Sequence, residues 1–222
     1  MLVLPNVWDV ASARRLADLP GVRGLATTSG GVARSLGWED GEGTPVDEML
    51  RVVERIAAAV SVPVTADLEA GYGDPPRTAA AALDAGAAGM NLEDSRGGAL
   101  ASVDEQAEIV RAVRAAAPPI VLNARVDVFL LGIGGVDEGV ERGNAYLEAG
   151  ADCVYPIFAS DRADIEALVR GIRGPVNVLL TTRAPSVGEL AKLGVARATW
   201  GAGLAHAALA EATRIAAAAL EA

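Results

Sequence analysis

Carboxylate side chains stand at the ends of neighbouring strand-like segments in the middle of the chain. Asp67 and Glu69 close one such segment, and Glu93 closes the next. Because Asp67 and Glu69 are two positions apart, their side chains face the same side of an extended strand. Carboxylates that gather at one site repel each other unless a cation lies between them. Oxygen donors without a nearby histidine favour a hard ion, so the sequence predicts a Mg2+ or Mn2+ site.

Groups that could hold an anion accompany these acids. Arg125 ends the following strand-like segment and offers a permanently charged, planar fork that suits a carboxylate or oxyanion. Ser29 is followed by Gly30 and Gly31, and glycines let backbone N–H groups approach an anion closely. An ordinary strand-to-helix turn would have the same composition. Because a predicted metal site and an arginine accompany this segment, we interpret it as a corner of the site that binds a carboxylate.

The elements that must position these residues alternate regularly. Short β-branched runs are followed by longer segments of helical period, with Gly, Pro or Asp between them. Strands are predicted at 2–7, 24–29, 63–69, 89–93, 120–127, 153–158, 176–181 and 197–200. Helices are predicted at 10–19, 46–60, 76–85, 103–116, 136–149, 162–172, 187–193 and 205–220.

Eight strand–helix units in 222 residues predict one closed (β/α)8 barrel, a single domain over residues 1–222. An open doubly wound sheet is the competing interpretation. It usually has fewer strands, and this chain lacks a glycine fingerprint after its first strand. Side chains at the carboxyl ends of barrel strands meet at one mouth, where the active sites of such barrels lie. The acids and Arg125 are therefore expected to share that mouth.

Composition excludes several classes of partner. A net charge of −10 would repel nucleic acid and anionic membrane surfaces. No apolar run reaches the roughly 20 residues that a membrane span needs. The single cysteine, Cys153, rules out an intramolecular disulfide and predicts a cytoplasmic protein. Cys153 is expected to be buried at the end opposite the mouth, and the only histidine, His206, to lie in the last helix away from the strand ends.

Six segments, in this order, resemble the isocitrate lyase/phosphoenolpyruvate mutase superfamily, specifically its 2-methylisocitrate lyase and phosphonomutase-like members. They are LPNVWD at 4–9, ATTSGG at 26–31, SLGWEDG at 35–41, ADLEAGYG at 66–73, NLED at 91–94 and NAR at 123–125. The resemblance implies a barrel enzyme that makes or breaks C–C or C–P bonds in small oxo-acids through an enolpyruvate-type intermediate. It also implies a Mg2+ ion, with Mn2+ as a substitute.

The resemblance assigns roles to the metal ligands and to the catalytic groups. Asp67 corresponds to the metal-coordinating aspartate, and Glu69 and Glu93 assist through bound waters. Arg125 corresponds to the arginine that steadies developing negative charge. Asp40 corresponds to an aspartate on a mobile segment over the site.

The resemblance also assigns substrate contacts and an assembly. Ser29, Gly30 and Gly31 correspond to the loop that holds the substrate carboxylate and oxo oxygens. Trp8, in the first matched segment, is a predicted substrate contact. For Tyr72, lining the substrate pocket and simple packing both stay open. Relatives exchange their last helix between subunits, so a homo-oligomer, dimer or tetramer, is expected.

The chain departs from the family in the segment that selects the reaction. The lyases carry Lys-Lys-Cys-Gly-His after the fourth strand, whereas residues 93–100 here read EDSRGGAL. The Lys and Asn of the phosphonate-processing members are missing too. The leading hypothesis is a Mg2+-dependent lyase that cleaves a C–C bond of a small 2-oxo acid or its aldol-type adduct, such as methylisocitrate or an oxaloacetate-like compound. Phosphonomutase or phosphonopyruvate hydrolase activity is the first alternative, and a non-catalytic oxo-acid-binding barrel is the second.

Overall fold

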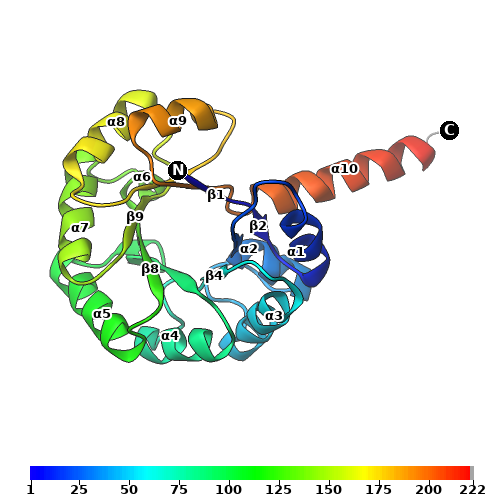
Figure 1. Ribbon diagram of the computed structural model, residues 1–222, viewed down its shortest axis with the longest axis horizontal. Coiled ribbons are helices and arrows are strands. Elements are labelled where there is room, and N and C mark those ends of the chain that lie inside the picture. The colour runs from blue at the N-terminus through cyan, green and yellow to red at the C-terminus, as the bar shows by residue number, and fades with distance from the viewer. Residues whose placement is uncertain (221–222) are drawn as a thin grey trace.

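A ring of parallel strands enclosed by helices forms the body of the molecule (Figure 1). The computed structural model describes residues 1–220. Six strands pair in the order β2-β3-β4-β5-β8-β9, and three pair in the order β1-β11-β10. Their bounds are β1 Leu2–Leu4, β2 Asn6–Val7, β3 Leu25–Thr27, β4 Val64–Asp67, β5 Gly89–Leu92, β8 Val121–Val126, β9 Cys153–Pro156, β10 Asn177–Leu179 and β11 Arg197–Thr199.

The first predicted strand closes the ring by pairing on both sides. Pro5 divides it, because proline has no N–H to donate to a ladder. The part before Pro5 pairs with β11, and the part after it pairs with β3. At the remaining junction, a parallel bridge joins Val154 of β9 to Val176 beside β10. Counting β1 and β2 as one strand gives the closed (β/α)8 barrel that the sequence predicts.

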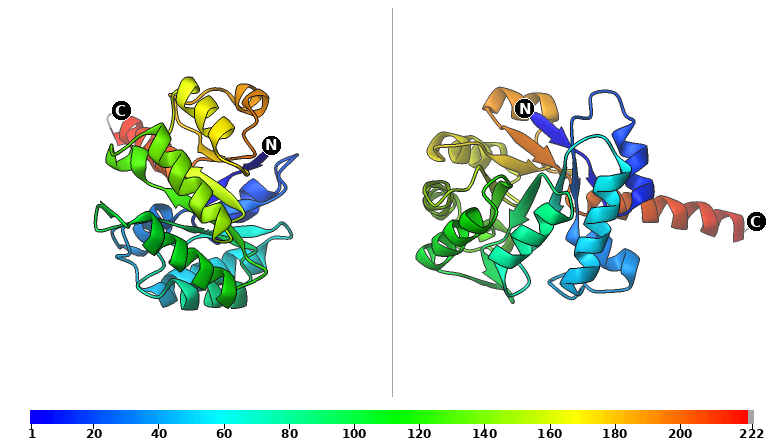
Figure 2. Two further views of the ribbon diagram at one scale, coloured as in Figure 1. Left: turned by 90° about the vertical axis from the view of Figure 1, so that its left-hand side faces the viewer. Right: turned by 60° about the horizontal axis from the view of Figure 1, so that its bottom comes forward.

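Helices follow each barrel strand and cover the outside of the ring (Figure 2). Eight of them match the predicted helices to within a few residues: α1 Val10–Ala17, α3 Val46–Ala59, α4 Pro75–Asp84, α5 Val103–Ala116, α7 Val136–Glu148, α8 Arg162–Gly171, α9 Val187–Leu193 and α10 Gly203–Leu220. The sequence did not predict four short elements: α2 Ser29–Leu36, α6 Val128–Leu131 and the hairpin β6 Ser95–Arg96 with β7 Ala99–Leu100.

Capping residues fix where several of these helices begin. The side chain of Ser102 accepts from the N–H of Glu105, whose carboxylate accepts from the N–H of Ser102 in return. Ser186 and Glu189 form the same capping box at α9. Each box satisfies backbone N–H groups that would otherwise lack a partner at the start of a helix. In both boxes the serine and the glutamate stand three residues apart, which is the spacing that a capping box requires.

The main core lies between the strands and the helices, and it consists largely of Val, Leu, Ile and Ala. Tyr146, Met90 and Leu122 are among its largest fully buried side chains. Gly89 permits the close approach of β5 to β8, because a Cβ there would lie 2.8 Å from the carbonyl oxygen of Val121. This tight packing holds β4, β5 and β8 in register, and those strands carry the predicted site.

Helix α10 leaves the ring and projects from it (Figures 1 and 2). Only Ala205 among its residues is buried, and residues 206–220 are exposed. The base of the helix is anchored beside α2, where a Cβ on Gly31 would lie 3.4 Å from the Cβ of Ala205. No helix within residues 1–220 is long and apolar enough to cross a membrane.

Candidate active site

Asp67, the last residue of β4, lies at the centre of the carboxyl-end mouth. Its Oδ2 accepts from the backbone N–H of Ser29 at 2.9 Å and from the Ser29 hydroxyl at 3.0 Å. Its Oδ1 accepts from Nδ2 of Asn91 at 3.2 Å, and its own N–H donates to Oγ1 of Thr27 at 2.8 Å. Neutral donors from the start of α2 and from β5 therefore fix the carboxylate. Asp67 retains 8% of its accessible surface.

The two glycines after Ser29 make room for residues from elsewhere in the chain. A Cβ on Gly30 would lie 2.6 Å from Oδ2 of Asp40, and a Cβ on Gly31 would lie 3.0 Å from the Cβ of Trp8. Side chains at these positions would push both neighbours away. The glycines thus bring Asp40 and Trp8 against the start of α2. Both residues were predicted to belong to the site, and the structure places them next to the loop of Ser29, Gly30 and Gly31.

Glu69 joins the loop after β4 to the loop that carries Asp40. Its Oε1 accepts from the Tyr72 hydroxyl at 2.8 Å, and its Oε2 accepts from the backbone N–H of Glu42 at 2.5 Å. The Glu42 side chain accepts in turn from the backbone N–H of Tyr72 at 2.5 Å. Glu42, Glu69 and Tyr72 all have positive φ, at 62°, 50° and 54°. Such backbone is uncommon for non-glycine residues and collects at functional sites.

The environment of Glu69 favours its protonated form. Burial raises the pKa of its carboxyl to about 7, the negative charges of Asp40 and Asp67 add to the rise, and the bonds from Tyr72 and Glu42 oppose it. A cation near these carboxylates would reverse that effect, because an opposite charge favours the ionised form. The Tyr72 hydroxyl donates to Glu69 directly, so Tyr72 is linked to a predicted site residue.

Arg125 is held between two carboxylates. Its Nε donates to Oδ1 of Asp127 at 2.5 Å and its Nη2 donates to Oδ2 of the same residue at 2.9 Å. Its Nη1 donates to Glu93. The bidentate pair with Asp127 orients the guanidinium plane. It occupies Nε and Nη2, so Nη1 is free to donate to Glu93. Burial raises the pKa of Glu93, as do the charges of Asp67 and Asp127, while Arg125 lowers it.

Asp94 and Asp127 hold Arg125 in place. They do not join the predicted metal-binding carboxylates at the mouth. Asp94 is fully buried, and its Oδ1 accepts from the backbone N–H of Asp127 at 2.9 Å. Its Oδ2 accepts from the Tyr146 hydroxyl at 2.8 Å and from Nη1 of Arg142 at 3.2 Å, both on α7. Sequence analysis missed Arg142 and Tyr146, because a charged residue within an amphipathic helix gives no sign that it faces inward.

The donor set suits a hard divalent ion. Within residues 1–220, no three or more His, Cys, Asp or Glu side chains are grouped so that they could hold a metal ion together. A carboxylate has about four acceptor positions, and Asp67 fills three of them with neutral donors. Glu69 and Glu93 lie close enough for the charge of Asp67 to raise their pKa values. Hard divalent ions such as Mg2+ prefer oxygen donors of this kind, and Asp67 has one acceptor position left that could bind one.

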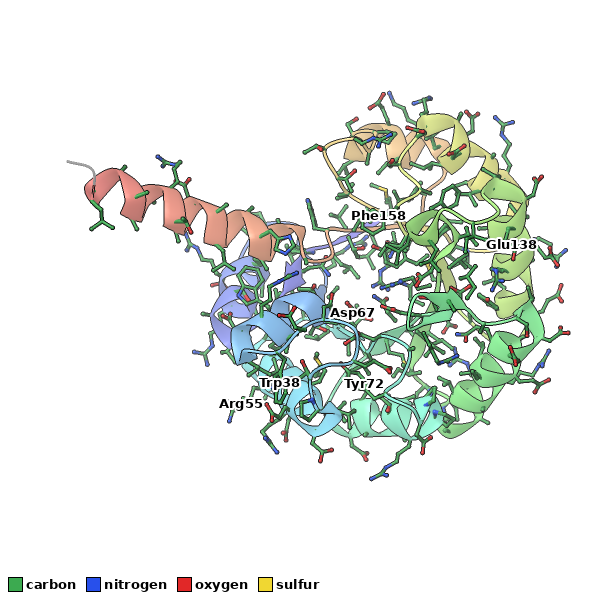
Figure 3. The ribbon with its side chains drawn as sticks, turned by 180° about the vertical axis from the view of Figure 1, so that it is seen from behind. Trp38, Arg55, Asp67, Tyr72, Glu138 and Phe158 are labelled. Atoms are coloured by element: carbon green, nitrogen blue, oxygen red, sulfur yellow. The ribbon has the colours of Figure 1, made fainter. Side chains whose placement is uncertain are left out.

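Figure 3 shows Asp67 and Phe158 toward the centre of the ring, with Arg55 and Glu138 on its outside. Cys153 is buried, as predicted, and burial raises the pKa of its thiol to about 11. His206 lies nearer the mouth than predicted. Its Nε2 is 2.6 Å from Nη1 of Arg34, and that guanidinium also donates to the carbonyl oxygen of Gly30 at 3.2 Å.

Two surface hollows lie away from these residues. One, about 580 Å³ in volume, is bordered by Arg96, Glu105 and Ile109, between the β6–β7 hairpin and α5. The other, about 270 Å³, is bordered by Arg51 and Asp84 between α3 and α4. Both lie on the outside of the barrel, and neither contains a predicted site residue. The candidate site therefore rests on the convergence of side chains at the mouth.

Comparison with known proteins gives consistent matches over the whole barrel. A family model described as phosphoenolpyruvate phosphomutase matches residues 1–220. The 2-methylisocitrate lyase of Escherichia coli (strain K12) is 31% identical over 182 residues, covering 75% of this chain and 61% of that enzyme. The chain therefore spans less than two thirds of the length of this relative.

Solved structures match more completely. A candidate phosphonomutase from Burkholderia cenocepacia J2315 is 40% identical with a TM-score of 0.89, covering 100% of this chain and 94% of that chain. A phosphonopyruvate hydrolase in complex with oxalate and Mg2+ is 25% identical with a TM-score of 0.88, covering 98% of this chain and 81% of that chain. These relatives share the barrel fold of this chain.

Proposed function

The chain belongs to the isocitrate lyase/phosphoenolpyruvate mutase superfamily of lyases and mutases, and from that premise we propose that it is a Mg2+-dependent carbon–carbon lyase. Its substrate would be a small 2-oxo acid or an aldol-type adduct of one. The observation that carries this proposal is the convergence of Asp67, Glu69, Glu93 and Arg125 on one mouth, beside the glycine loop after Ser29.

We propose that Asp67 holds the ion directly and that Glu69 and Glu93 reach it through bound water. When bound, Mg2+ supplies positive charge where an oxo oxygen becomes an enolate oxygen. The phosphonopyruvate hydrolase complex with Mg2+ supports this assignment by similarity. The raised pKa values of Glu69 and Glu93 support it physically, because each carboxyl lies where further negative charge is unfavourable.

In the cleavage of an aldol-type adduct, the hydroxyl group of the adduct would lose its proton and become the carbonyl of one product. The electron pair of the C–C bond would stay on the other fragment as an enolate, which takes up one proton to give the second product. Arg125 stabilises this negative charge, because Asp127 orients its guanidinium before the substrate arrives. Gly30 and Gly31, in the first turn of α2, would offer backbone N–H groups to the substrate carboxylate beside Ser29. Asp40 and Trp8, which contact that loop, are proposed to close over the bound substrate.

Phosphonopyruvate hydrolysis or phosphonomutase chemistry is the second candidate function. The similarity to the candidate phosphonomutase favours it, because that match has 40% identity and covers 94% of the relative. Both chemistries pass through a similar enolate, so the same mouth serves either. The group bonded to the enolate carbon distinguishes them: a carbon fragment in one case and a phosphonate in the other.

A substrate screen tests both candidates. The protein is loaded with Mg2+ and incubated separately with methylisocitrate, oxaloacetate and phosphonopyruvate, and the products are measured, including pyruvate, oxalate and phosphoenolpyruvate. We expect turnover of a carbon-linked substrate and its loss when the metal is chelated. Turnover of phosphonopyruvate alone would select the C–P candidate, with pyruvate as the product of hydrolysis and phosphoenolpyruvate as the product of the mutase reaction. Binding of oxalate without turnover of any of the three would overturn both and favour a non-catalytic oxo-acid-binding barrel.

We also propose that this single-domain, cytoplasmic enzyme is a homo-oligomer assembled through α10. The exposed residues of that helix include Leu209 and Ile215, which have few neighbours within their own chain. An apolar helix surface of this kind is stable in water when a second subunit covers it. A dimer or tetramer would provide that cover.

A further inference from the structure

A short loop between α2 and α3 folds back tightly on itself. Its two ends meet at Glu39 and Gly43, where a Cβ on Gly43 would lie 2.5 Å from the carbonyl oxygen of Glu39. Gly41 and Glu42 have φ of 88° and 62°, and two consecutive residues of positive φ are typical of a tight turn. Because the loop is this compact, Asp40 and Glu42 are held in a fixed relation to each other.

Glu42 attaches this loop to the loop that follows β4. Its backbone N–H donates to Oε2 of Glu69 at 2.5 Å, and its side chain accepts from the backbone N–H of Tyr72 at 2.5 Å. The Tyr72 hydroxyl donates to Oε1 of Glu69 at 2.8 Å and completes a closed ring of hydrogen bonds. We refer to this ring of Glu42, Glu69 and Tyr72 as the latch.

Asp40 lies at the other contact of the loop, against the start of α2. A Cβ on Gly30 would lie 2.6 Å from Oδ2 and 3.1 Å from Cγ of Asp40. Among the hydrogen bonds that the structure describes, those of Glu42 are the only ones that join residues 39–43 to the rest of the chain. The position of Asp40 therefore depends on the latch.

The loop joins two segments that both adjoin Asp67. Ser29, next to Gly30, donates to the Asp67 carboxylate through its N–H and its hydroxyl. Glu69 is two residues beyond Asp67, and the charges of Asp40 and Asp67 both raise its pKa. Asp40 and the latch thus belong to the same charged environment as the predicted metal ligand.

The latch holds the loop against two opposing effects. Its members are three of the four non-glycine residues with positive φ within residues 1–220. Backbone in this region persists only where surrounding contacts over-determine it. The carboxylates of Glu42 and Glu69 also lie in one ring, and like charges repel. Removing one hydrogen bond of the latch would therefore favour release of the loop.

We infer that Glu42 is a positioning residue for the mouth: by closing the latch it holds residues 39–43 in place and keeps Asp40 against Gly30. The inference rests on the proposed function, in which Asp40 closes over the bound substrate beside Ser29. Glu42 acts through Asp40 and does not itself contact the substrate. A site that is complete only while the latch is closed has an affinity reduced by the fraction of molecules in which the latch is open.

Three substitutions of Glu42 test this inference. Glu42→Gln keeps an oxygen that accepts from the N–H of Tyr72, whereas Glu42→Gly and Glu42→Ala remove it. Glycine suits a φ of 62° and alanine does not, so these two variants lose the same bond but differ in backbone strain. Hydrogen exchange of residues 38–44, oxalate affinity with Mg2+ by calorimetry, and thermal unfolding are measured for each.

We expect Glu42→Gly and Glu42→Ala to exchange residues 38–44 about tenfold faster and to bind oxalate about threefold to tenfold more weakly, the equivalent of one lost hydrogen bond. Glu42→Gln should stay within about threefold of the wild type in both. Thermal unfolding should rank the glycine variant above the alanine variant. Similar losses of oxalate affinity at different stabilities would support positioning. Losses that follow stability would reduce Glu42 to a structural residue and overturn the inference.

A double variant tests whether Glu42 acts through Asp40. Oxalate affinity is compared between Asp40→Ala and the protein that carries both Asp40→Ala and Glu42→Gly. We expect no further loss from Glu42→Gly once the Asp40 side chain is absent, because coupled residues are not additive. Additive losses would contradict the inference. Glu54→Ala, on the exposed face of α3, is the control and should have wild-type affinity.

The unmodified protein separates this inference from the proposed function. If oxalate does not bind it in the presence of Mg2+, the proposed site is wrong, and the role of Glu42 fails with it. If oxalate binds, and Glu42→Gly speeds exchange of residues 38–44 without weakening oxalate, only the positioning role is wrong. The two failures therefore give different patterns.

Discussion

Asp67 illustrates how much of the site depends on one carboxylate. Its side chain bonds residues of both α2 and β5, through Ser29 and Asn91. Replacing it with Asn keeps the shape of the side chain but removes the negative charge on which a hard cation depends. We expect Asp67→Asn to weaken Mg2+ binding by more than about 100-fold, since even the loss of an outer-shell partner costs 10- to 100-fold.

Calorimetry with Mg2+, or paramagnetic resonance with Mn2+, measures this loss directly. Asp104→Asn is the matched control, because it removes the same charge from an exposed position at the start of α5. Thermal unfolding should show that both variants stay folded. Wild-type affinity in Asp67→Asn would reject the metal assignment.

Arg125 differs from lysine in geometry more than in charge. Its Nε and Nη2 bond to both oxygens of Asp127 while Nη1 remains for Glu93, and an ammonium group cannot reproduce this fork. We expect Arg125→Lys to lower kcat/KM by roughly 100-fold or more, the usual cost of losing one oriented donor to an oxyanion. Arg111→Lys, on the exposed face of α5, should have wild-type kinetics. Wild-type turnover in Arg125→Lys would make Arg125 a structural residue.

Cys153 gives a pH-dependent prediction that needs no substrate. Burial raises the pKa of its thiol to about 11, above the ordinary value near 8.5. The folded state thus favours the neutral thiol. The contribution of this thiol to the free energy of unfolding is complete below pH 8.5 and is lost as the pH rises through 11. At pH 8 we expect a disulfide reagent to label the native protein far more slowly than the unfolded chain. Equal labelling rates would show that the thiol is accessible.

At the scale of elements, α7 braces the site arginine from outside the barrel. Tyr146 and Arg142 bond Asp94, Asp94 bonds the backbone of Asp127, and Asp127 holds Arg125. Tyr146→Phe removes one donor from a buried carboxylate, at a cost of about 1–3 kcal/mol in the free energy of unfolding.

Because this chain of contacts ends at Arg125, we expect Tyr146→Phe to lower kcat by severalfold with little change in KM. Denaturant unfolding and steady-state kinetics measure the two effects separately. A variant that loses stability but keeps full kcat would limit α7 to a structural role. Thr213→Val, a similar loss of a hydroxyl on exposed α10, serves as the control.

Secondary-structure periodicity predicted the strands and most helices, because buried strands and amphipathic helices leave strong patterns. It missed α2, which begins at Ser29 with Gly30 and Gly31, residues of low helix propensity. That helix forms where Trp8 and Asp40 pack against the glycines, a tertiary effect that local sequence does not contain.

The β6–β7 hairpin was also missed, although its signal was present. Gly97 and Gly98 form a two-residue connection with φ of 57° and 80°, which matches the Gly-Gly turns of tight hairpins. The mouth residues themselves were predictable, because carboxylates and an arginine followed strands that a barrel must bring together. Their partners on α7 were not, since inward-facing Arg142 looks like a surface residue in the sequence.

At the scale of the molecule, the projecting helix α10 predicts assembly. Leu209 and Ile215 are 60% and 56% exposed. We expect the 22.5 kDa chain to form a dimer or tetramer at micromolar concentration, measured by light scattering after size exclusion. Replacing both residues with Glu should shift it toward the monomer, because charge on an apolar contact opposes association. Leu19→Glu, exposed on the barrel, is the control. A wild-type monomer would contradict the proposed oligomer.

The way the first strand divides at Pro5 bears on the order in which the chain can fold during synthesis. Residues 2–4 pair with β11, which ends at Thr199, so they have no partner until synthesis has passed that strand. Until then the growing sheet is an open arc with free edges, the form most exposed to wrong pairing with other chains. Closure of the ring is thus a late event in the folding of this barrel, because it joins the first strand to the last.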